Sequence, residues 1–252
     1  MQLGGDDIQE NDALKIYRGD DYIINEKIKI HQPTLGEITL WGEQKYFSFI
    51  HSFTSTPTDL KYQLSLMNID WNTISDYELF MTIYKTFDKS RSEIVFGDID
   101  FQKFKPMIRN NEELVLYDKD SGIIIDRSIY EIAISYLRKT HNLKKNVEKA
   151  MNETTKTVLL EEAKEQFEMA QKETSHSYLL PLISTMINME GFKCNWTTVW
   201  DMKINAFMDA VEQILHIKNV DLLLNSGYSG FGVDLKKINK KELNYFSKSG
   251  ES

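Results

Sequence analysis

Apolar and polar residues near the start of the chain alternate first with a strand-like and then with a helix-like period. Residues 27–31, Lys-Ile-Lys-Ile-His, alternate charged and apolar side chains, which predicts a half-buried strand. Pro33 ends this segment, and Thr34 and Glu37 have the spacing of a capping box. Aromatic and aliphatic residues then recur at helical spacing over 35–53, which predicts one helix with an aromatic inner face.

Two further helices are expected before residue 90. Pro57 suits the first position of a helix whose apolar stripe lies within 60–67. Ser75 is a plausible cap for the next helix, because a hydroxyl there can accept a bond from an unpaired amide. Apolar residues at helical spacing within 79–87 give that helix a strongly hydrophobic side.

A β-rich stretch is expected next. The apolar residues at 93–97 predict a short strand. Segments 114–117 and 123–125 flank a five-residue polar turn and predict a β-hairpin. Asp126 is then expected to cap a helix that runs to about residue 140 with its apolar side facing inward.

The segment 142–173 is charged and favours helix, but its apolar stripe is narrow. The residues of this stripe are Val147, Met151, Thr154, Val158, Ala163, Phe167 and Ala170. Such a stripe suits an arm, a helical hairpin or self-association through 142–173. The alternative is a surface helix that lies along the body of the protein.

The last region is expected to contain helices only. They cover 178–190, ended by Gly191, and 203–218, extended by a turn or two before Gly227, and Asn239 caps a short closing helix.

These elements predict an α+β fold that is predominantly helical. A small β-hairpin or sheet is expected in the N-terminal half and an all-helical C-terminal half. The organisation expected is a flexible tail over 1–12, an α+β domain over 13–141, a long charged helix or arm over 142–176, and a helical domain over 177–252.

The composition of the chain argues against several classes of function. The 252 residues are 41% hydrophobic and 27% charged, as in ordinary globular proteins, and the formal net charge is −8. An acidic chain argues against general nucleic-acid binding, because phosphate contacts favour a basic face. No apolar run approaches the roughly 18 residues of a membrane span, and no signal peptide is apparent, so a soluble protein without membrane partners is expected.

No arrangement of reactive residues predicts an enzyme, a metal site or a cofactor. Cys194 is the sole cysteine, which excludes an intramolecular disulfide, and the five histidines show no metal-ligand spacing. The turn at 118–122 resembles the start of a calcium loop but lacks its later ligands, so a hairpin turn is favoured. The glycine-rich stretch 227–232 follows a helix rather than a strand, which argues against a nucleotide loop.

Large rings are the candidates for contacts with a partner, because aromatic residues dominate binding hot spots. The residues proposed on this basis are Trp41, Phe49, Trp196, Trp200, Tyr228 and Phe231. The alternative is that rings at helical spacing belong to the core.

The chain resembles proteins encoded in the tail gene modules of phages and prophages of low-GC Gram-positive bacteria. The most specific matches include Leu-Leu-Pro-Leu-Ile at 179–183 and Ser-Gly-Tyr-Ser-Gly-Phe-Gly at 226–232. Further matching stretches lie at 30–38, 56–59, 190–193, 198–201, 206–209, 234–238 and 241–244. These are packing motifs rather than catalytic ones, so the resemblance assigns no functional residue.

The resemblance implies a tail assembly chaperone that works in the host bacterial cytoplasm. Such a protein binds apolar helical stretches of the tape-measure protein, shields them from aggregation and promotes polymerisation of the tail tube. One alternative is a structural subunit of the tail, baseplate or connector that stays in the virion. A third, a metal-dependent enzyme acting on nucleic acid, requires carboxylates that converge in one cleft.

Overall fold

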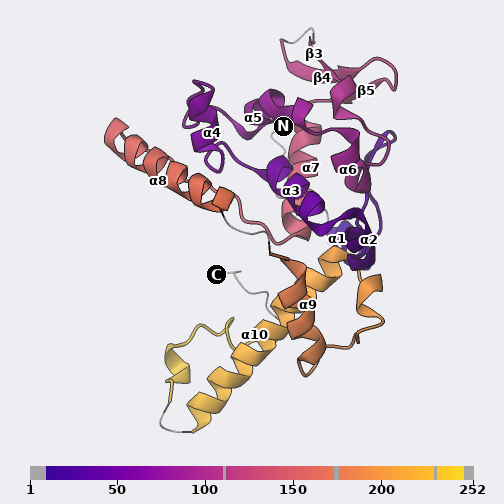
Figure 1. Cartoon of the computed structure of the whole chain (residues 1–252). Helices are drawn as coiled ribbons and strands as arrows, with labels where there is room; N and C mark the ends of the chain where they lie inside the picture. Colours follow the sequence, from indigo (N-terminus) through magenta and orange to yellow (C-terminus); the bar gives the residue numbers. More distant parts are fainter. Residues whose placement is uncertain (1–9, 110–111, 173–175, 230–231, 247–252) are drawn as a thin grey trace.

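The first half of the chain contains two groups of short strands separated by a run of short helices, and helices make up the second half (Figure 1). The computed structural model describes residues 10–109, 112–172, 176–229 and 232–246. The α-helices are α1 (Glu10–Arg18), α2 (Leu35–Trp41), α3 (Glu43–Thr54), α4 (Lys61–Leu66), α5 (Asp76–Ile83), α6 (Lys89–Phe96), α7 (Arg127–Thr140), α8 (Glu153–Lys172), α9 (Leu179–Asn188) and α10 (Ile204–Tyr228). The 3-10 turns are η1 (Tyr84–Thr86), η2 (Phe101–Lys103), η3 (Val199–Asp201) and η4 (Leu235–Lys237).

Two small antiparallel sheets accompany these helices and confirm the predicted α+β, predominantly helical class. The first pairs β1 (Tyr22–Asn25) with β2 (Ile28–Ile30), and β2 lies within the strand predicted at 27–31. The second has the order β3–β4–β5, with β3 (Lys105–Ile108), β4 (Leu114–Asp118) and β5 (Ile123–Ile125). The hairpin between β4 and β5 is the predicted one, whereas the edge strand β3 and strand β1 had not been anticipated.

Three helices begin at the predicted caps. Thr34 and Ser75 each form a complete capping box, with Glu37 and Glu78 respectively returning a bond to the backbone amide of the cap. The Asp126 carboxylate accepts a 2.9 Å bond from an amide in the first turn of α7. These side chains satisfy amides that have no partner within their helix, and they fix where each helix starts.

The single helix predicted over 35–53 is instead two helices. Gly42 separates α2 from α3 and has φ +105°, a conformation that residues with a Cβ rarely adopt. The chain changes direction at Gly42, so α2 and α3 present different faces to the core.

The strand predicted at 93–97 is also wrong, because residues 93–96 form the end of α6. Asp88 caps this helix by accepting a bond from the amide of Arg91, and Gly97, with φ +59°, follows its last residue. The β-branched and aromatic residues of 93–97 therefore pack from a helix, with Val95 and Phe96 buried.

The centre of the protein is a cluster of aromatic rings from α3, α5, α6 and α7. Phe53 has ring neighbours on four other elements, α5, α6, α7 and η2, including Phe96 at 5.1 Å and Phe80 at 5.7 Å between centroids. Buried residues of the C-terminal helices, such as Leu179 and Phe207, belong to the same apolar core. The core therefore extends across the predicted boundaries at residues 141 and 177.

The long helix predicted over 142–173 begins only at Glu153. The residues just before it form no helix, and side chains from earlier in the chain hydrogen-bond to their backbone. The Asn72 side chain donates to the carbonyl of Ala150 and accepts from its amide, both at 2.9 Å. The Thr58 hydroxyl donates to the carbonyl of Glu148 at 2.9 Å. Val147 and Met151, members of the predicted stripe, are consequently exposed.

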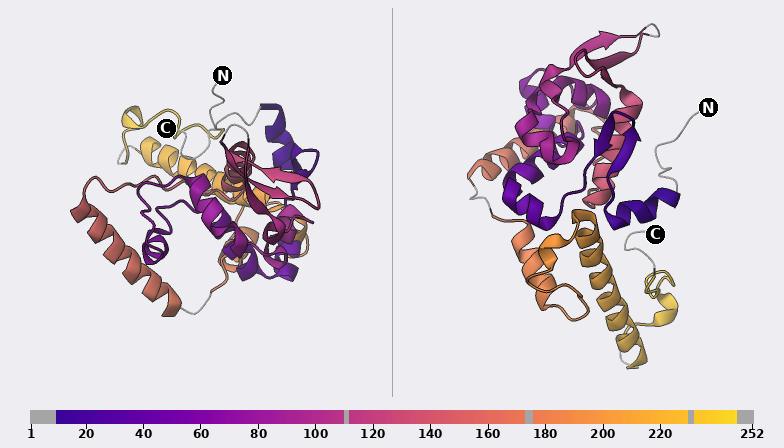
Figure 2. Two further views of the ribbon diagram at one scale, coloured as in Figure 1. Left: turned by 90° about the horizontal axis from the view of Figure 1, so that it is seen from above. Right: turned by 90° about the vertical axis from the view of Figure 1, so that its right-hand side faces the viewer.

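Helix α8 lies beside α4 and projects away from the central core (Figures 1 and 2). None of its residues is fully buried. Phe167 contacts Tyr62 with ring centroids 5.4 Å apart, and Leu160 packs partly buried against a small second cluster around Leu64 and Trp71. One side of α8 thus contacts its own chain, and the predicted self-association remains a prediction.

Residues 232–246, which we call the C-terminal strap, run back along α10. The His216 Nε2 atom lies 2.9 Å from the carbonyl oxygen of Asn244, and the Tyr245 hydroxyl donates to Asp221 at 2.7 Å. The closing helix predicted at Asn239 is a turn, and α10 continues through Gly227 to Tyr228.

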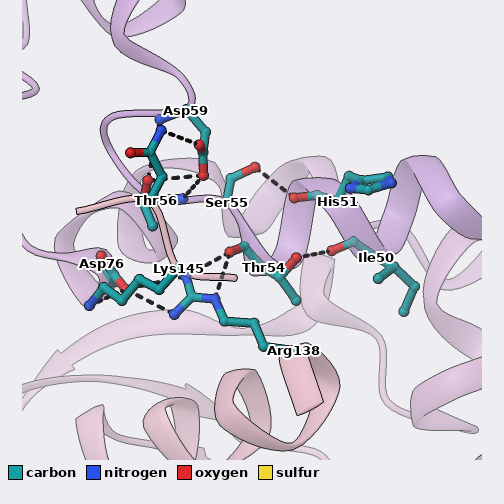
Figure 3. Close-up of polar contacts among 10 residues, drawn as sticks. Ile50, His51, Thr54, Ser55, Thr56, Asp59, Asp76, Arg138 and Lys145 are labelled. Carbon is teal, nitrogen blue, oxygen red and sulfur yellow. Dashed lines mark hydrogen bonds and ion pairs between the residues drawn. The ribbon is translucent and has the colours of Figure 1, made fainter. Parts of the chain in front are cut away.

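Arg138 joins two helix ends near the start of the non-helical segment (Figure 3). Its guanidinium donates to the carbonyl of Thr54, the last residue of α3, at 2.7 and 3.1 Å. The same guanidinium lies 3.4 Å from the carboxylate of Asp76, the first residue of α5, which Lys145 also contacts at 3.0 Å. A cation at the C-terminal end of one helix and an anion at the N-terminal start of another both interact favourably with the helix dipoles.

Replacing Arg138 by methionine is expected to lower the free energy of unfolding by about 2 kcal/mol, because the Thr54 carbonyl and the Asp76 carboxylate lose a donor in a largely buried setting. Chemical denaturation followed by circular dichroism measures this loss. Lys139→Met is the matched control, since Lys139 is the next residue and is exposed. Equal effects of the two substitutions would contradict a specific role for the guanidinium.

Candidate interaction surfaces

Trp196 and Trp200 lie together at the surface in the loop that precedes α10. Their rings meet edge to face with centroids 5.7 Å apart. Trp196 is 67% exposed and Trp200 is partly buried. The loop approaches α2 at Gly36, where an added Cβ would lie 3.1 Å from the Trp200 carbonyl oxygen. The missing side chain at this glycine therefore lets the loop pack closely against α2 at Trp200.

Leu40 and Trp41 lie at the end of the same helix. Leu40 is 92% exposed, and it shares a helix face with Gly36 because four residues separate them. Trp41 is partly buried, and the Lys45 ammonium lies over its ring at 4.1 Å from the centroid. Its indole N–H is buried without an acceptor among the described residues. We call Leu40, Trp41, Trp196 and Trp200 the α2 surface; it combines three of the six predicted ring residues with a leucine that had not been predicted.

A hollow of about 490 Å³ opens beside Leu40 and Trp41, and we call it the α2 hollow. Its volume lies within the range of small-ligand pockets. The apolar part of its lining also includes Ile94 and Val95 of α6. Its polar lining consists of Asp21, Lys29, His31, Glu37 and Glu93.

His31 lies between two carboxylates in this hollow. Its Nδ1 atom is 2.8 Å from Asp21 and its Nε2 atom is 3.6 Å from Glu37, while Lys29 contacts Asp21 at 3.0 Å. Partial burial raises the pKa of Asp21, but the hydrogen bonds from His31 and Lys29 outweigh it, so the pKa lies below its ordinary value. Asp21 is therefore ionised at neutral pH and orients the imidazole.

A histidine held by an aspartate resembles part of a catalytic triad, which also needs a nucleophile. The lining of the α2 hollow includes no serine, threonine, cysteine or tyrosine. His31 therefore has no hydroxyl or thiol to activate within the residues that form this hollow.

Phe49 was predicted to contact a partner, and the structure corrects this. Its ring is 1% exposed and packs edge to face on Phe87 and Phe96, with centroids 5.7 and 6.1 Å away. Phe49 faces the core because the break at Gly42 sets the orientation of α3 independently of α2. It is a core residue and cannot anchor a partner.

The last two predicted ring residues lie at the far end of α10. Tyr228 is 81% exposed and ends the helix. Phe231 lies outside the residues that the structure describes. The far end of α10, which Tyr228 closes, projects away from the core (Figure 2).

The sequence had not singled out the exposed aliphatic residues of α10. Val211, Leu215 and Leu222 share one helix face, which we call the α10 stripe, and it continues the face that buries Ile204 and Met208. Val211 is partly buried, Leu215 is 52% exposed and Leu222 is 69% exposed. The spacing of these residues along a helix does not show where a long helix leaves the body of the protein.

The remaining candidates for chemistry have structural roles. The turn at 118–122 is the tip of the β4–β5 hairpin, where Asp118 accepts bonds from the amide of Asp120 and from the Ser121 hydroxyl. Over the described ranges, no group of three or more His, Cys, Asp or Glu residues is placed to hold a metal ion. Cys194 is partly buried against the core, and Gly227 lies within α10 rather than in a phosphate-binding loop.

No helix in the described part of the chain combines the length and apolar character needed to cross a membrane. Comparisons with protein-family models, with curated proteins and with solved structures gave no match to this chain.

Proposed function

We propose that this chain is a non-enzymatic morphogenesis factor of phage tails that binds apolar helical segments of a tape-measure or tail-tube protein in the host cytoplasm. The identity of the partner rests on the resemblance of the sequence to tail-module proteins. The observation that supports a binding role is the α10 stripe, whose Leu215 and Leu222 are 52% and 69% exposed.

Burial of these leucines supplies the driving force for binding. A leucine side chain that moves from water into an apolar contact contributes about 1.5–3 kcal/mol. An amphipathic helix of a partner that lies along α10 would cover residues spaced by four and seven positions on one face. Leu180 of α9, 64% exposed, adds a further apolar side chain in the same C-terminal region. This mode of binding shields an apolar helix from water without any covalent chemistry.

Co-expression with a tape-measure fragment tests the proposal. The wild-type chain is expected to keep the fragment soluble and to co-purify with it. The double variant Leu215→Gln/Leu222→Gln is expected to lose at least about tenfold in affinity, since two apolar contacts are removed while glutamine preserves the helix.

Leu66→Gln is the matched control, because Leu66 is 65% exposed on a different helix, α4. It is expected to bind as the wild type does. Absence of association while both partners are soluble would refute the proposal. Equal loss of binding in the double variant and in the control would show that the α10 stripe is not the contact.

A structural subunit of the tail, baseplate or connector is the second candidate, and α8 favours it. This helix projects from the core with none of its residues fully buried, as expected of an element that interlocks with a neighbouring subunit. Mass spectrometry of purified particles separates the two: a chaperone is absent from mature particles, whereas a subunit is present at a fixed copy number.

A further inference from the structure

We propose that the segment that docks on the α10 stripe is an amphipathic helix with a carboxylate among its apolar residues, placed to pair with Lys218. This inference rests on the proposed function, because it specifies which helices the stripe selects. It is carried by a lysine that interrupts the apolar face of α10 and by the exposure of the leucines on either side of it.

Lys218 lies on the same face of α10 as the stripe. Val211, Leu215, Lys218 and Leu222 follow one another at intervals of four, three and four residues. In a helix this spacing aligns the four side chains, as in the contact seam of a coiled coil. Leu215 and Leu222 are 52% and 69% exposed, and Lys218 between them is partly buried. The face therefore offers apolar contacts above and below one positive charge.

The Lys218 ammonium has no ion pair among the described residues. The nearest carboxylate along α10 is that of Asp221, which lies toward another side of the helix and accepts a bond from the Tyr245 hydroxyl at 2.7 Å. The other acidic residues of α10, Asp209 and Glu212, precede Lys218 by more than one turn. A helix that covers the stripe removes water from this ammonium, so a carboxylate in that helix offsets the lost hydration.

The C-terminal strap leaves this face of α10 open. Its contacts are with Gln213, His216 and Asp221, which point away from the line of Leu215 and Leu222. A partner helix can therefore lie along the stripe while the strap stays in place.

A second copy of this chain does not match the stripe. Two α10 helices packed in parallel place the two copies of Lys218 at the same level. Antiparallel packing that sets Leu215 of one copy against Leu222 of the other brings the same two lysines together, because Lys218 lies between these leucines. Like charges that meet in an apolar contact repel each other at short range. Lys218 therefore selects a helix of opposite charge and opposes self-association through the stripe.

Titration of the ¹⁵N-labelled full chain with synthetic helical peptides tests the proposal. Two alanine-rich peptides carry leucines and one glutamate at the intervals of the stripe, one in the direct and one in the reversed order. One of them is expected to give saturable shifts of the Leu215, Lys218 and Leu222 amides at about millimolar concentration. The same peptide with glutamine in place of glutamate is expected to bind about fivefold more weakly.

Lys218→Glu is the decisive variant, and it is expected to reverse this preference. It binds the glutamine peptide about fivefold more tightly than the glutamate peptide, because two carboxylates now meet. Lys240→Glu makes the same change in net charge at an exposed lysine of the strap, and this control is expected to keep the preference for glutamate. Leu215→Gln/Leu222→Gln is expected to bind neither peptide.

Absence of saturable binding, equal binding of the glutamate and glutamine peptides, or an unchanged preference in Lys218→Glu would overturn the proposal. A wild-type dimer in sedimentation that Leu215→Gln/Leu222→Gln abolishes would also overturn it, since the stripe would then join two copies. The proposed function is tested separately by capture of the tape-measure fragment. Capture that depends on the two leucines but not on Lys218 would leave that function standing and remove the recognition of a carboxylate.

Discussion

Replacement of Phe49 by alanine is expected to lower the free energy of unfolding by about 3–5 kcal/mol, as large-to-small substitutions of buried aromatic residues do. The ring is 1% exposed and lies among the rings of Phe53, Phe87 and Phe96. Its removal leaves a cavity that rigid aromatic neighbours fill poorly, so both the transfer energy and the packing contacts are lost. Urea denaturation followed by circular dichroism measures the change.

Leu40→Ala is the control for this substitution. Leu40 is 92% exposed, so its truncation is expected to change stability by less than about 0.5 kcal/mol. A loss below about 1 kcal/mol for Phe49→Ala would place the ring near the surface and restore it as a candidate anchor. The pair of variants thus tests the correction that the structure makes to the predicted interaction surface.

Acidification from pH 6.5 to pH 4 is expected to cost the protein about 3 kcal/mol through His141 alone. Burial lowers the pKa of His141 from 6.5 to about 4. Its Nδ1 atom donates to the Leu137 carbonyl at 2.8 Å, and its Nε2 atom accepts from the Tyr46 hydroxyl at 2.6 Å, an arrangement that requires the neutral ring. Burial raises the pKa of Tyr46 well above its usual value, so this hydroxyl remains a donor.

The sign of the effect follows from proton uptake. Between pH 6.5 and pH 4 the unfolded chain binds a proton at His141 that the folded chain excludes, so stability falls as the pH falls. Above about pH 8, well above the ordinary pKa of 6.5, the ring is neutral in both states and contributes no slope. His51, whose pKa burial also lowers, acts in the same direction.

Denaturation curves at several pH values measure this slope, with His141→Gln as the comparison. Glutamine does not titrate, so the variant is expected to lose the part of the slope that His141 contributes, although it is less stable at pH 7. His51→Gln is the second comparison, because His51 is closer to solvent. An unchanged slope in His141→Gln would show that the ring is accessible to protons in the folded state.

Local signals predicted the helix starts. Thr34, Ser75 and Asp126 each stand directly before a run of apolar residues at helical spacing, and each carries an oxygen that can accept a bond from the first turn. Such caps depend only on residues within one turn, so no tertiary information is needed. The turn between β4 and β5 was predictable for the same reason.

Elements that depend on distant residues were not predictable in this way. The residues at 93–97 favour a strand by composition, but Asp88, five residues earlier, caps a helix that includes all of them except Gly97. Strand β3 contains Pro106 and does not alternate, and it becomes a strand only by pairing with β4. The non-helical path before α8 depends on Asn72, which is about eighty residues away in the chain.

The residues of the interaction surfaces also differ in whether the local sequence or the whole fold decides their exposure. Trp41 and Phe49 were assigned to one helix and considered together, yet the break at Gly42 leaves Trp41 at the surface and places Phe49 in the core. Leu215 and Leu222 have the spacing of core residues, and only the fold shows that α10 extends beyond the body that would cover them.

The segment between α7 and α8 also has a consequence for how this protein can evolve. Thr58 and Asn72 hold it through the carbonyl of Glu148 and through the amide and carbonyl of Ala150. Every residue has the carbonyl, and every residue except proline has the amide N–H. Most substitutions at positions 148 and 150 therefore keep these hydrogen bonds, whereas substitutions that remove the hydroxyl at position 58 or the side-chain amide at position 72 lose them. In diverged descendants of this chain we expect the side chains of Thr58 and Asn72 to persist while the residues at positions 148 and 150 change more readily.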